Sequence, residues 1–249
     1  DLNPKIVIVE PNSSNNVVEV AKKLNIPVCE VKIKKDDPSG LFNLFDIESE
    51  YKLPEESNEG LVLHTSGTTS RPKIVPLTNK NIYSSSENIS KSLNLSEADH
   101  CLNIMPLFHI HGLIAILAAS IRSGASVCAS NGFNGLKFLE LAKSEKITWY
   151  SGVPTMHQAI LLRAEKNLEL AKNLNLRFIR SSSASLPPAV FEKLNSVFGC
   201  SVIEAYGMTE ATHQMTSNPL PPKKQKPGFV GIPAGPEVCI MDEKDKILD

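Results

Sequence analysis

Apolar residues along the chain follow two alternating periods. Short runs rich in Val, Ile and Leu, such as residues 5–9, are typical of buried strands, and longer stretches between them have apolar residues at every third or fourth position. In residues 15–24, we expect Val17, Val18, Val20 and Ala21 on the inner side of a helix. The pattern predicts strands over 5–9, 28–33, 61–63, 101–105, 125–129, 147–151, 176–180 and 201–205, and helices over 15–24, 78–93, 112–122, 134–144, 154–166 and 187–198.

Strands that alternate with helices of this length predict an α/β fold, in which repeated β-α units form a largely parallel sheet with helices on both faces. The tail differs, because residues 219–228 are rich in Pro and Lys and residues 237–248 have the pattern of a β-hairpin. We expect three parts: a partial leading β-α-β segment and loop over 1–59, an α/β core over 60–220, and a loop and β-hairpin tail over 221–249.

The charges of the chain nearly cancel, with 26 Lys and Arg against 27 Asp and Glu and a net charge of −1. A nucleic-acid surface normally shows as a basic excess, so we expect no nucleic-acid partner, whereas one small anionic ligand is compatible with this balance. The longest apolar run, residues 113–119, is far shorter than the roughly 20 residues that cross a bilayer, so we expect no membrane span. The oligomeric state is left open.

Five cysteines are widely spaced, and the sequence has no CxxC pair or Cys/His cluster. This favours free core thiols in a reducing compartment over disulfides or zinc. With no leader-type segment at the start, we expect a cytoplasmic protein. A peroxisomal location stays open for a longer parent protein, because its C-terminal tripeptide would lie beyond residue 249.

The stretch HTSGTTSRPKIVPLT, residues 64–78, places small donors and a lysine directly after a predicted strand. Consecutive backbone N–H groups in such a turn form an anion-binding nest, to which hydroxyls add donors and Lys73 adds a charge. The stretch lacks the second glycine of a Walker-type P-loop. Taken alone, a Ser/Thr/Gly loop is more often a mobile surface turn than a phosphate site.

The segment EAYGMTEATH, residues 204–213, combines an aromatic, a glycine, a hydroxyl and a carboxylate after another strand. These residues are typical of a site in which Tyr206 covers a flat ring of the ligand, Thr209 contacts a phosphate, and Glu210 binds a hard cation such as Mg²⁺. The alternative is that Tyr206 is a core residue and that Thr209 caps a helix with Glu210 in its first turn. The segment alone does not decide between the two.

Two further loops also follow strands. RSSSASLPP, residues 180–188, offers backbone and hydroxyl groups with little bulk, or else caps the helix that begins near Pro187. MPLFHIHGL, residues 105–113, contains His109 and His111, and a zinc site is disfavoured because no third ligand is near in sequence. Since ligands bind outside the carboxyl ends of parallel strands, the joint occurrence of these four loops favours a ligand site.

In this order and with these separations, TSGTTSRPK, PLFHIHG, RSSSASL and YGMTEATH resemble the motifs of the adenylate-forming superfamily, which contains acyl-CoA synthetases, luciferases and peptide-synthetase adenylation domains. The TSR variant of the first loop and the EATH extension resemble the oxalyl-CoA synthetase (oxalate–CoA ligase) branch. The resemblance covers about residues 5–242 and makes the part over 60–220 an AMP-binding core. It implies ATP, Mg²⁺, coenzyme A as co-substrate, and a small carboxylic acid as substrate.

The resemblance also implies a role for individual residues. In this family the first loop closes over the β- and γ-phosphates of ATP, and the later loops hold adenine, the α-phosphate, Mg²⁺ and the acid. The implied nucleotide-binding residues are Thr65, Ser66, Gly67, Thr68, Thr69, Lys73, Ser183, Ala184, Ser185, Tyr206, Gly207 and Thr209; the catalytic ones are Lys73, Thr209 and Glu210, with Mg²⁺ at Glu210; and the substrate-binding ones are His109, Ser183 and His213.

The implied reaction has two halves: a carboxylate attacks the α-phosphate of ATP, and the acyl-adenylate then reacts with the thiol of coenzyme A. Ser183 and His213 are candidates to hold the second carboxylate of a small diacid, with oxalate expected, because a short dianion needs donors where a fatty acid needs an apolar tunnel. One alternative is a medium- or long-chain acyl-CoA synthetase, and another is a non-catalytic nucleotide-binding module.

The sequence departs from the family in two ways. It ends at Asp249, before the family's C-terminal domain, and it also starts late. The resemblance therefore implies a truncated central part of the large N-terminal domain, which we expect to be inactive on its own. In addition, Ile74 follows the lysine where the family usually has glycine; a positive φ there would strain a β-branched residue by about 1–3 kcal/mol.

Overall fold

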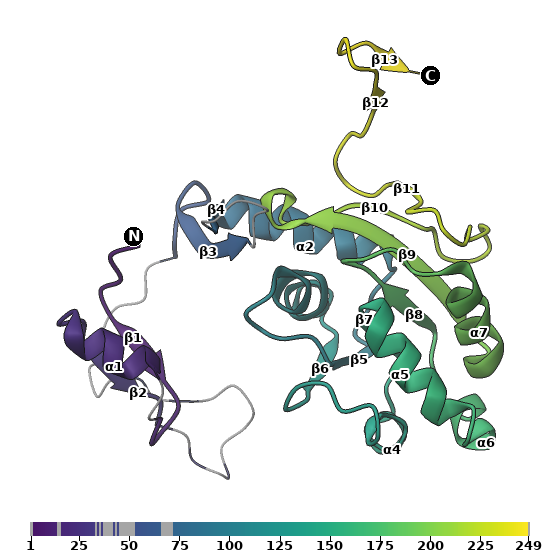
Figure 1. The fold of residues 1–249 in the computed structure, drawn as a ribbon, viewed down its shortest axis with the longest axis horizontal. Coiled ribbons are helices and arrows are strands. Elements are labelled where there is room, and N and C mark those ends of the chain that lie inside the picture. The colour runs from purple at the N-terminus through teal and green to yellow at the C-terminus, as the bar shows by residue number, and fades with distance from the viewer. Residues whose placement is uncertain are drawn as a thin grey trace. The chain divides into compact units, whose positions relative to one another are not determined.

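The chain divides into two compact units, Asp1–Leu53 and Pro54–Asp249. In the first unit, β1 (Val7–Val9) and β2 (Val28–Glu30) pair in parallel and are joined by α1 (Asn16–Lys23), as predicted (Figure 1). The predicted domain limits at residues 59 and 220 remain predictions. The computed structural model describes residues 2–13, 16–32, 34, 36, 42, 44, 53–65 and 72–248.

The second unit is built on a sheet of seven strands. They are β5 (His100–Asn103), β6 (Ser126–Ala129), β7 (Trp149–Gly152), β8 (Phe178–Ser181), β9 (Ser201–Met208), β10 (His213–Ser217) and β11 (Ile232–Pro233). Their order in the sheet is β11-β10-β9-β8-β7-β5-β6. Strands β5 to β9 run parallel, and β10 and β11 extend the sheet antiparallel. The predicted α/β class with a largely parallel sheet is confirmed.

Helices cover both faces of this sheet (Figure 1). One face carries α4 (Phe138–Ser144), α5 (Pro154–Ala164), α6 (Leu168–Lys172) and α7 (Pro188–Phe198). The other carries α2 (Asn79–Ser92), the π-helix η1 (His111–Ala118) and α3 (Ala119–Arg122). Among the described residues, no helix has the length and apolarity to cross a membrane.

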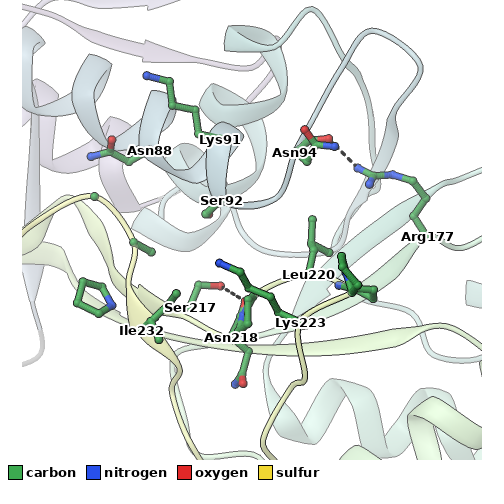
Figure 2. Close-up of a pocket in the computed structure, with 16 residues that line it drawn as sticks. Asn88, Lys91, Ser92, Asn94, Arg177, Ser217, Asn218, Leu220, Lys223 and Ile232 are labelled. Atoms are coloured by element: carbon green, nitrogen blue, oxygen red, sulfur yellow. Dashed lines mark hydrogen bonds between the residues drawn. The ribbon is translucent and has the colours of Figure 1, made fainter.

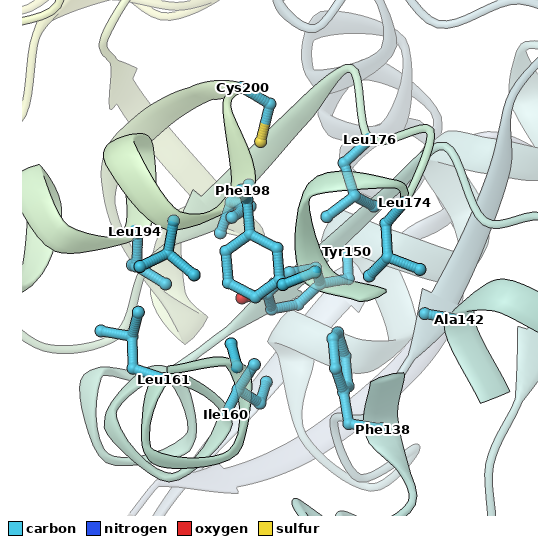
Figure 3. Packing of buried hydrophobic residues seen from close by; sticks show 14 of the residues in the cluster. Phe138, Ala142, Tyr150, Ile160, Leu161, Leu174, Leu176, Leu194, Phe198 and Cys200 are labelled. Atoms are coloured by element: carbon cyan, nitrogen blue, oxygen red, sulfur yellow. The ribbon is translucent and has the colours of Figure 1, made fainter. Parts of the chain in front are cut away.

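Successive residues of a strand point to opposite faces of the sheet. Because helices cover both faces, the parallel strands are mostly apolar along their whole length. On β7, Trp149 packs with the α2 and η1 side, and Tyr150 packs with the α4 to α7 side. Figure 3 shows Tyr150 in the apolar cluster on the α4 to α7 side, between Phe138 and Phe198. The rings of Phe138 and Tyr150 meet edge to face with centroids 4.7 Å apart.

The segment after the first motif differs from the prediction. Strand β4 (Lys73–Thr78) pairs antiparallel with β3 (Glu59–Thr65) in a separate two-stranded sheet, so the motif joins a hairpin instead of following a strand of the main sheet. Pro72 and Pro76 argue against a strand here, because proline is rare inside strands, and β4 is therefore not predicted. In the structure Val75 and Leu77, two residues apart on one face of β4, are buried in the core.

Other helices and strands also differ from the sequence prediction in their limits or in being present. Strand β9 extends to Met208 and returns through the short turn η2 (Thr209–Ala211) into the unpredicted antiparallel strand β10. Helix α6 is likewise absent from the sequence prediction. The expected tail hairpin is present as β12 (Ile240–Met241) and β13 (Ile247–Leu248). Thr78 caps α2: its Oγ1 accepts from the Asn81 N–H, and Asn81 Oδ1 accepts from the Thr78 N–H.

Helix α5 offers a matched test of this packing. Ile160 is completely buried between α5 and the sheet, whereas Leu162, two residues further on, is 63% exposed. We expect Ile160→Ala to lower the free energy of unfolding by about 2–5 kcal/mol because it leaves a cavity. Leu162→Ala is expected to change it by less than about 0.5 kcal/mol. Urea titration of both variants checks this, and equal losses would contradict the assigned face of α5.

Candidate active site

The loops that carry the motifs meet at the carboxyl edge of the parallel strands. The chain leaves β5 for β6 on one side and returns to β7 on the other side of β5, which is a topological switch point. His109 follows β5, Ser183 follows β8, and Thr209 follows β9. Sheet topology therefore brings together residues that are far apart in the sequence.

A cavity of about 410 Å³ opens at this edge. Residues from all four motifs contribute to its wall, and the β3–β4 hairpin supplies one side through the register pair Thr65 and Lys73. The lining residues are Thr65, Lys73, His109, Ile110, Ser183, Gly207, Met208, Thr209, Glu210 and His213.

A second cavity of about 260 Å³ shares Ser183 and Gly207 with the first. Its wall includes Tyr206, whose side chain is 48% exposed, together with Ala184 and Ser185. Glu204 lies beside it, buried, and its Oε2 accepts from the Gly228 N–H at 2.8 Å. Every described residue that the motifs nominated lines one of these two cavities.

The predicted phosphate residues Ser66, Gly67, Thr68 and Thr69 lie outside the described residues, so their position stays a prediction. Ile74 is described, and the expected strain at this residue is not found. It lies in β4 opposite His64, in extended backbone with no positive φ. A β-branched side chain suits such a strand position.

Three non-glycine residues at the cavity have left-handed backbone: Ser183 with φ 71°, Thr212 with φ 53° and His213 with φ 92°. Such residues each cost of order 1–3 kcal/mol and cluster at functional sites. The turn is held because the Thr212 N–H donates to the Thr209 carbonyl and Ser85 Oγ donates to the Thr212 carbonyl. The surrounding structure holds this backbone against its strain, and Ser183 and His213 line the cavity.

Behind Ser183 lies a buried set of polar side chains. His111 Nδ1 is 3.0 Å from Ser183 Oγ, and His111 Nε2 is 2.6 Å from Ser151 Oγ. Arg180 Nη1 lies 3.3 Å from Ser151 Oγ, and Arg180 Nη2 donates to Gln214 Oε1 at 3.1 Å. Except for Ser183, which is exposed, these side chains are almost fully buried.

His213 lines the cavity with an unsatisfied ring. It is only 2% exposed, and its Nδ1 has no hydrogen-bond partner within the described residues. Its ring lies 5.0 Å from that of His111. Burial, and then the nearby positive charge of Arg180, hold the pKa of His213 well below its usual range, so the ring is neutral. An unpaired buried nitrogen at a cavity wall is a candidate contact for a ligand.

A larger hollow of the second unit, about 820 Å³, lies elsewhere (Figure 2). Two of its three lining cations, Lys91 and Arg177, already have acidic partners, and the third is Lys223. Lys91 pairs with Glu87 at 2.7 Å, and Arg177 pairs with Asp99 at 2.8 Å. Figure 2 shows Arg177 turned toward Asn94 at the rim. We therefore regard the smaller motif-lined cavity as the candidate site, although it is not the largest.

Sequence reasoning missed Arg180, Ser151 and Gln214, and it considered His111 only as a metal ligand. One signal was available for Arg180. In the strand FIRS it stands two residues after the buried Phe178, on the same face, where a charged side chain breaks the apolar pattern. Its partners come from other strands and helices, so their spacing gives no sign of the network.

Gly207 allows β9 and β10 to approach each other at the cavity. A Cβ on this residue would lie 1.4 Å from the His213 carbonyl oxygen, so Gly207→Ala forces β10 away. We expect this variant to lose at least about 2 kcal/mol of stability. Gly135→Ala, whose Cβ would have no neighbour closer than 3.4 Å, is the control. Thermal unfolding measures both, and an unchanged melting temperature for Gly207→Ala would contradict the close approach.

Three buried histidines predict how stability depends on pH. Burial is the main cause that lowers the pKa of His111, His213 and His157, that of His157 to about 4. Below about pH 6.5 the unfolded chain protonates these rings and the folded chain does not. Their contribution to stability is therefore complete above pH 6.5 and is lost as the pH falls, and that of His157 is lost as the pH falls toward 4.

The variant His157→Gln tests this dependence, because it removes one such proton. It should reduce the slope of unfolding free energy against pH by about 1.4 kcal/mol per pH unit between pH 6 and 4.5. Denaturant titrations at several pH values give the slope. A slope that is the same in the variant and in the unchanged protein would show that His157 is not buried neutral.

Comparison with known proteins places this site in a family. The family described as "AMP-binding enzyme" matches residues 1–248. The chain is 42% identical over 257 aligned residues to an oxalate–CoA ligase of Arabidopsis thaliana, covering 100% of this chain and 50% of that protein. It is 46% identical over 192 residues to an oxalate–CoA ligase of Saccharomyces cerevisiae, covering 77% of this chain and 35% of that protein.

A solved structure agrees with these relatives. The crystal structure of ATP-bound MatB from Rhodopseudomonas palustris matches with a TM-score of 0.81 and 27% identity, over 99% of this chain and 48% of that chain. The chain thus spans about half the length, or less, of the proteins it matches. The four motifs, the sheet topology and the match over residues 1–248 agree, and the chain belongs to the AMP-binding enzyme family.

Proposed function

We propose that the complete protein containing this chain joins a small dicarboxylic acid, oxalate, to the thiol of coenzyme A in an ATP-dependent reaction. The observation that carries the proposal is the 410 Å³ cavity, which brings residues of all four motifs around one small polar space. Two relatives are named oxalate–CoA ligases, which supports the same acid.

The residues of the two cavities fit a nucleotide. Tyr206 is half exposed beside Ser183, Ala184 and Ser185, so its ring is free to cover a purine in the smaller cavity. At Gly207, which lines both cavities, main chain is accessible without side-chain bulk. Thr209 and Lys73 would then meet the phosphates in the larger cavity, with Thr65, Ser66, Gly67, Thr68 and Thr69 closing over them.

Glu210 fits a magnesium ion bound together with the nucleotide. It is exposed and lines the cavity, and Mg²⁺ commonly uses one or two carboxylates with phosphate oxygens and water. Among the described residues, no group of three or more His, Cys, Asp or Glu side chains forms a complete metal site, which agrees with a shared ion. When bound, Mg²⁺ offsets negative charge on the departing pyrophosphate.

The chain's residues then act by positioning and charge. An oxygen of the acid attacks the α-phosphorus, and the bond from that phosphorus to the pyrophosphate oxygen breaks. Thr209 and Lys73 donate to phosphate oxygens as their charge changes, while His109 lines the space for the acid. In the second half the thiol loses its proton, its sulfur bonds to the acyl carbon, and the bond from that carbon to the AMP oxygen breaks, so that AMP leaves.

Ser183 and His213 are proposed to hold the second carboxylate. Both line the cavity, the Ser183 hydroxyl is exposed to it, and His213 Nδ1 is unpaired. A pocket whose donors need an acceptor rejects acids that leave them unpaired, which favours a diacid over a fatty acid.

An acid panel with the complete protein tests the proposal. We expect ATP–pyrophosphate exchange with oxalate and far less with acetate or decanoate. His213→Ala should lower kcat/KM for oxalate by about 10- to 100-fold, the range for a lost hydrogen bond to a charged group, and change the KM for ATP little. His64→Ala, an exposed histidine outside both cavities, is the control.

Other outcomes of the panel identify the alternatives. A preference for decanoate that His213→Ala leaves unchanged would indicate a medium- or long-chain acyl-CoA synthetase. ATP binding without exchange for any acid would indicate a non-catalytic nucleotide-binding module. Either result would overturn the proposed function.

A further inference from the structure

Arg180 is a buried cation without an acidic partner. It lies in the centre of β8, is 0% exposed, and pairs with no carboxylate in the described part of the chain. Its Nε has no hydrogen-bond partner there either. Because an uncompensated buried charge is unfavourable, such a residue needs an explanation beyond packing.

The side chains around Arg180 are neutral. Nη2 donates to Gln214 Oε1, and Gln214 is held in turn because its Nε2 donates to Ser92 Oγ at 2.9 Å. Nη1 faces Ser151 Oγ at 3.3 Å and His111 Nε2 at 3.4 Å. Burial lowers the pKa of Arg180 only to about 10, so the guanidinium remains charged at neutral pH. The positive charge therefore has to be balanced by something other than these residues.

The contacts of Arg180 favour one direction for the hydrogen bonds that lead to the cavity. Arginine can only donate, and its Nη1 faces both Ser151 Oγ and His111 Nε2, so a hydrogen on that ring nitrogen would point toward a cation. Ser151 Oγ therefore accepts from Arg180 and gives its own hydrogen to His111 Nε2. The neutral His111 ring then carries its hydrogen on Nδ1 and donates it to Ser183 Oγ at 3.0 Å. Ser183 has accepted a hydrogen bond, so its hydroxyl hydrogen is free to point into the cavity.

On the basis of the proposed function, we propose that Arg180 is a positioning residue that selects acids with a second carboxylate. It fixes the direction of the chain Arg180–Ser151–His111–Ser183, so that Ser183 presents a donor to the substrate. Its uncompensated charge also attracts the additional negative charge of a dianion through a dry interior, where electrostatic interactions are screened weakly.

A purely structural Arg180 would behave differently. If Arg180 only packed β8 against α2 and η1, its loss would disturb the fold and weaken the binding of all substrates equally. If it selects the second carboxylate, its loss weakens binding of a dianion and spares a singly charged acid of the same shape. Oxamate meets this need, because an amide replaces one carboxylate of oxalate.

The experiment uses the complete protein with Arg180→Met, which removes the charge and keeps an apolar chain of similar length. We expect the KM for oxalate to rise by about tenfold or more, with a smaller change in kcat, while the inhibition constant of oxamate and the KM for ATP change by less than about threefold. Arg180→Lys, which restores the charge, should recover part of the oxalate affinity. Arg163→Met, the same substitution on α5 outside both cavities, should change none of these.

The unchanged protein separates this proposal from the proposed function. If it shows no oxalate-dependent exchange, the proposed function is wrong, and the selection proposal falls with it. If the unchanged protein uses oxalate, only the Arg180 proposal is tested by the variant. That proposal is overturned if Arg180→Met weakens the binding of oxalate and of oxamate equally, or weakens the binding of neither. Thermal unfolding of each variant shows whether it is folded.

A second measurement needs no variant of Arg180. Long-range ¹H–¹⁵N spectra of the histidine-labelled protein report which ring nitrogen of His111 carries hydrogen, with the signal assigned by its loss in His111→Gln. We expect hydrogen on Nδ1 and none on Nε2. Hydrogen on Nε2 would reverse the direction of the hydrogen bonds between Ser151, His111 and Ser183. This result would overturn the proposal even if Arg180→Met does not fold.

Discussion

The parallel strands β5 to β9 are covered by helices on both faces, so a polar side chain within them must find its partners inside the protein. Most strand positions meet this constraint by being apolar, as Tyr150 and Ile179 do toward α4 to α7. Ser151 and Arg180 meet it instead through hydrogen bonds to His111 and Gln214. The polar exception lies next to the carboxyl edge of the sheet, where the candidate site opens.

The same constraint gives the cavity its character. His111 and His213 are held neutral by burial, so the charges near the cavity come from Lys73, Glu210 and the deeper Arg180. Left-handed backbone at Ser183 and His213 keeps two of the polar groups at the cavity wall. A preformed set of donors around a small volume suits a short, charged ligand better than a long apolar one.

Much of the fold follows from the sequence. Short apolar runs and helical patterns locate the parallel strands and the larger helices, because helices bury both faces of the parallel strands. Strand β4 is missed because prolines flank and interrupt it, and β10 is missed because its residues are mostly polar although they are buried.

The candidate site is predictable to a smaller extent. The motifs nominate residues such as Ser183, Thr209 and His213, which the sheet topology brings to one edge. The ligand that each contacts remains a prediction. The Arg180 network is not predictable from spacing, because Ser151, His111 and Gln214 come from different elements. The register of β7 and β8 places Ser151 opposite Arg180, and helix and strand packing bring in the other two. An arginine at a core-facing strand position is the one sequence feature that points to it.

The most direct test of this account is a crystal structure of the complete protein with oxalate and a non-hydrolysable ATP analogue. We expect oxalate in the 410 Å³ cavity, with carboxylate oxygens about 3 Å from Ser183 Oγ and from a ring nitrogen of His213. Oxalate bound elsewhere, or in that cavity without contact to either side chain, would contradict it.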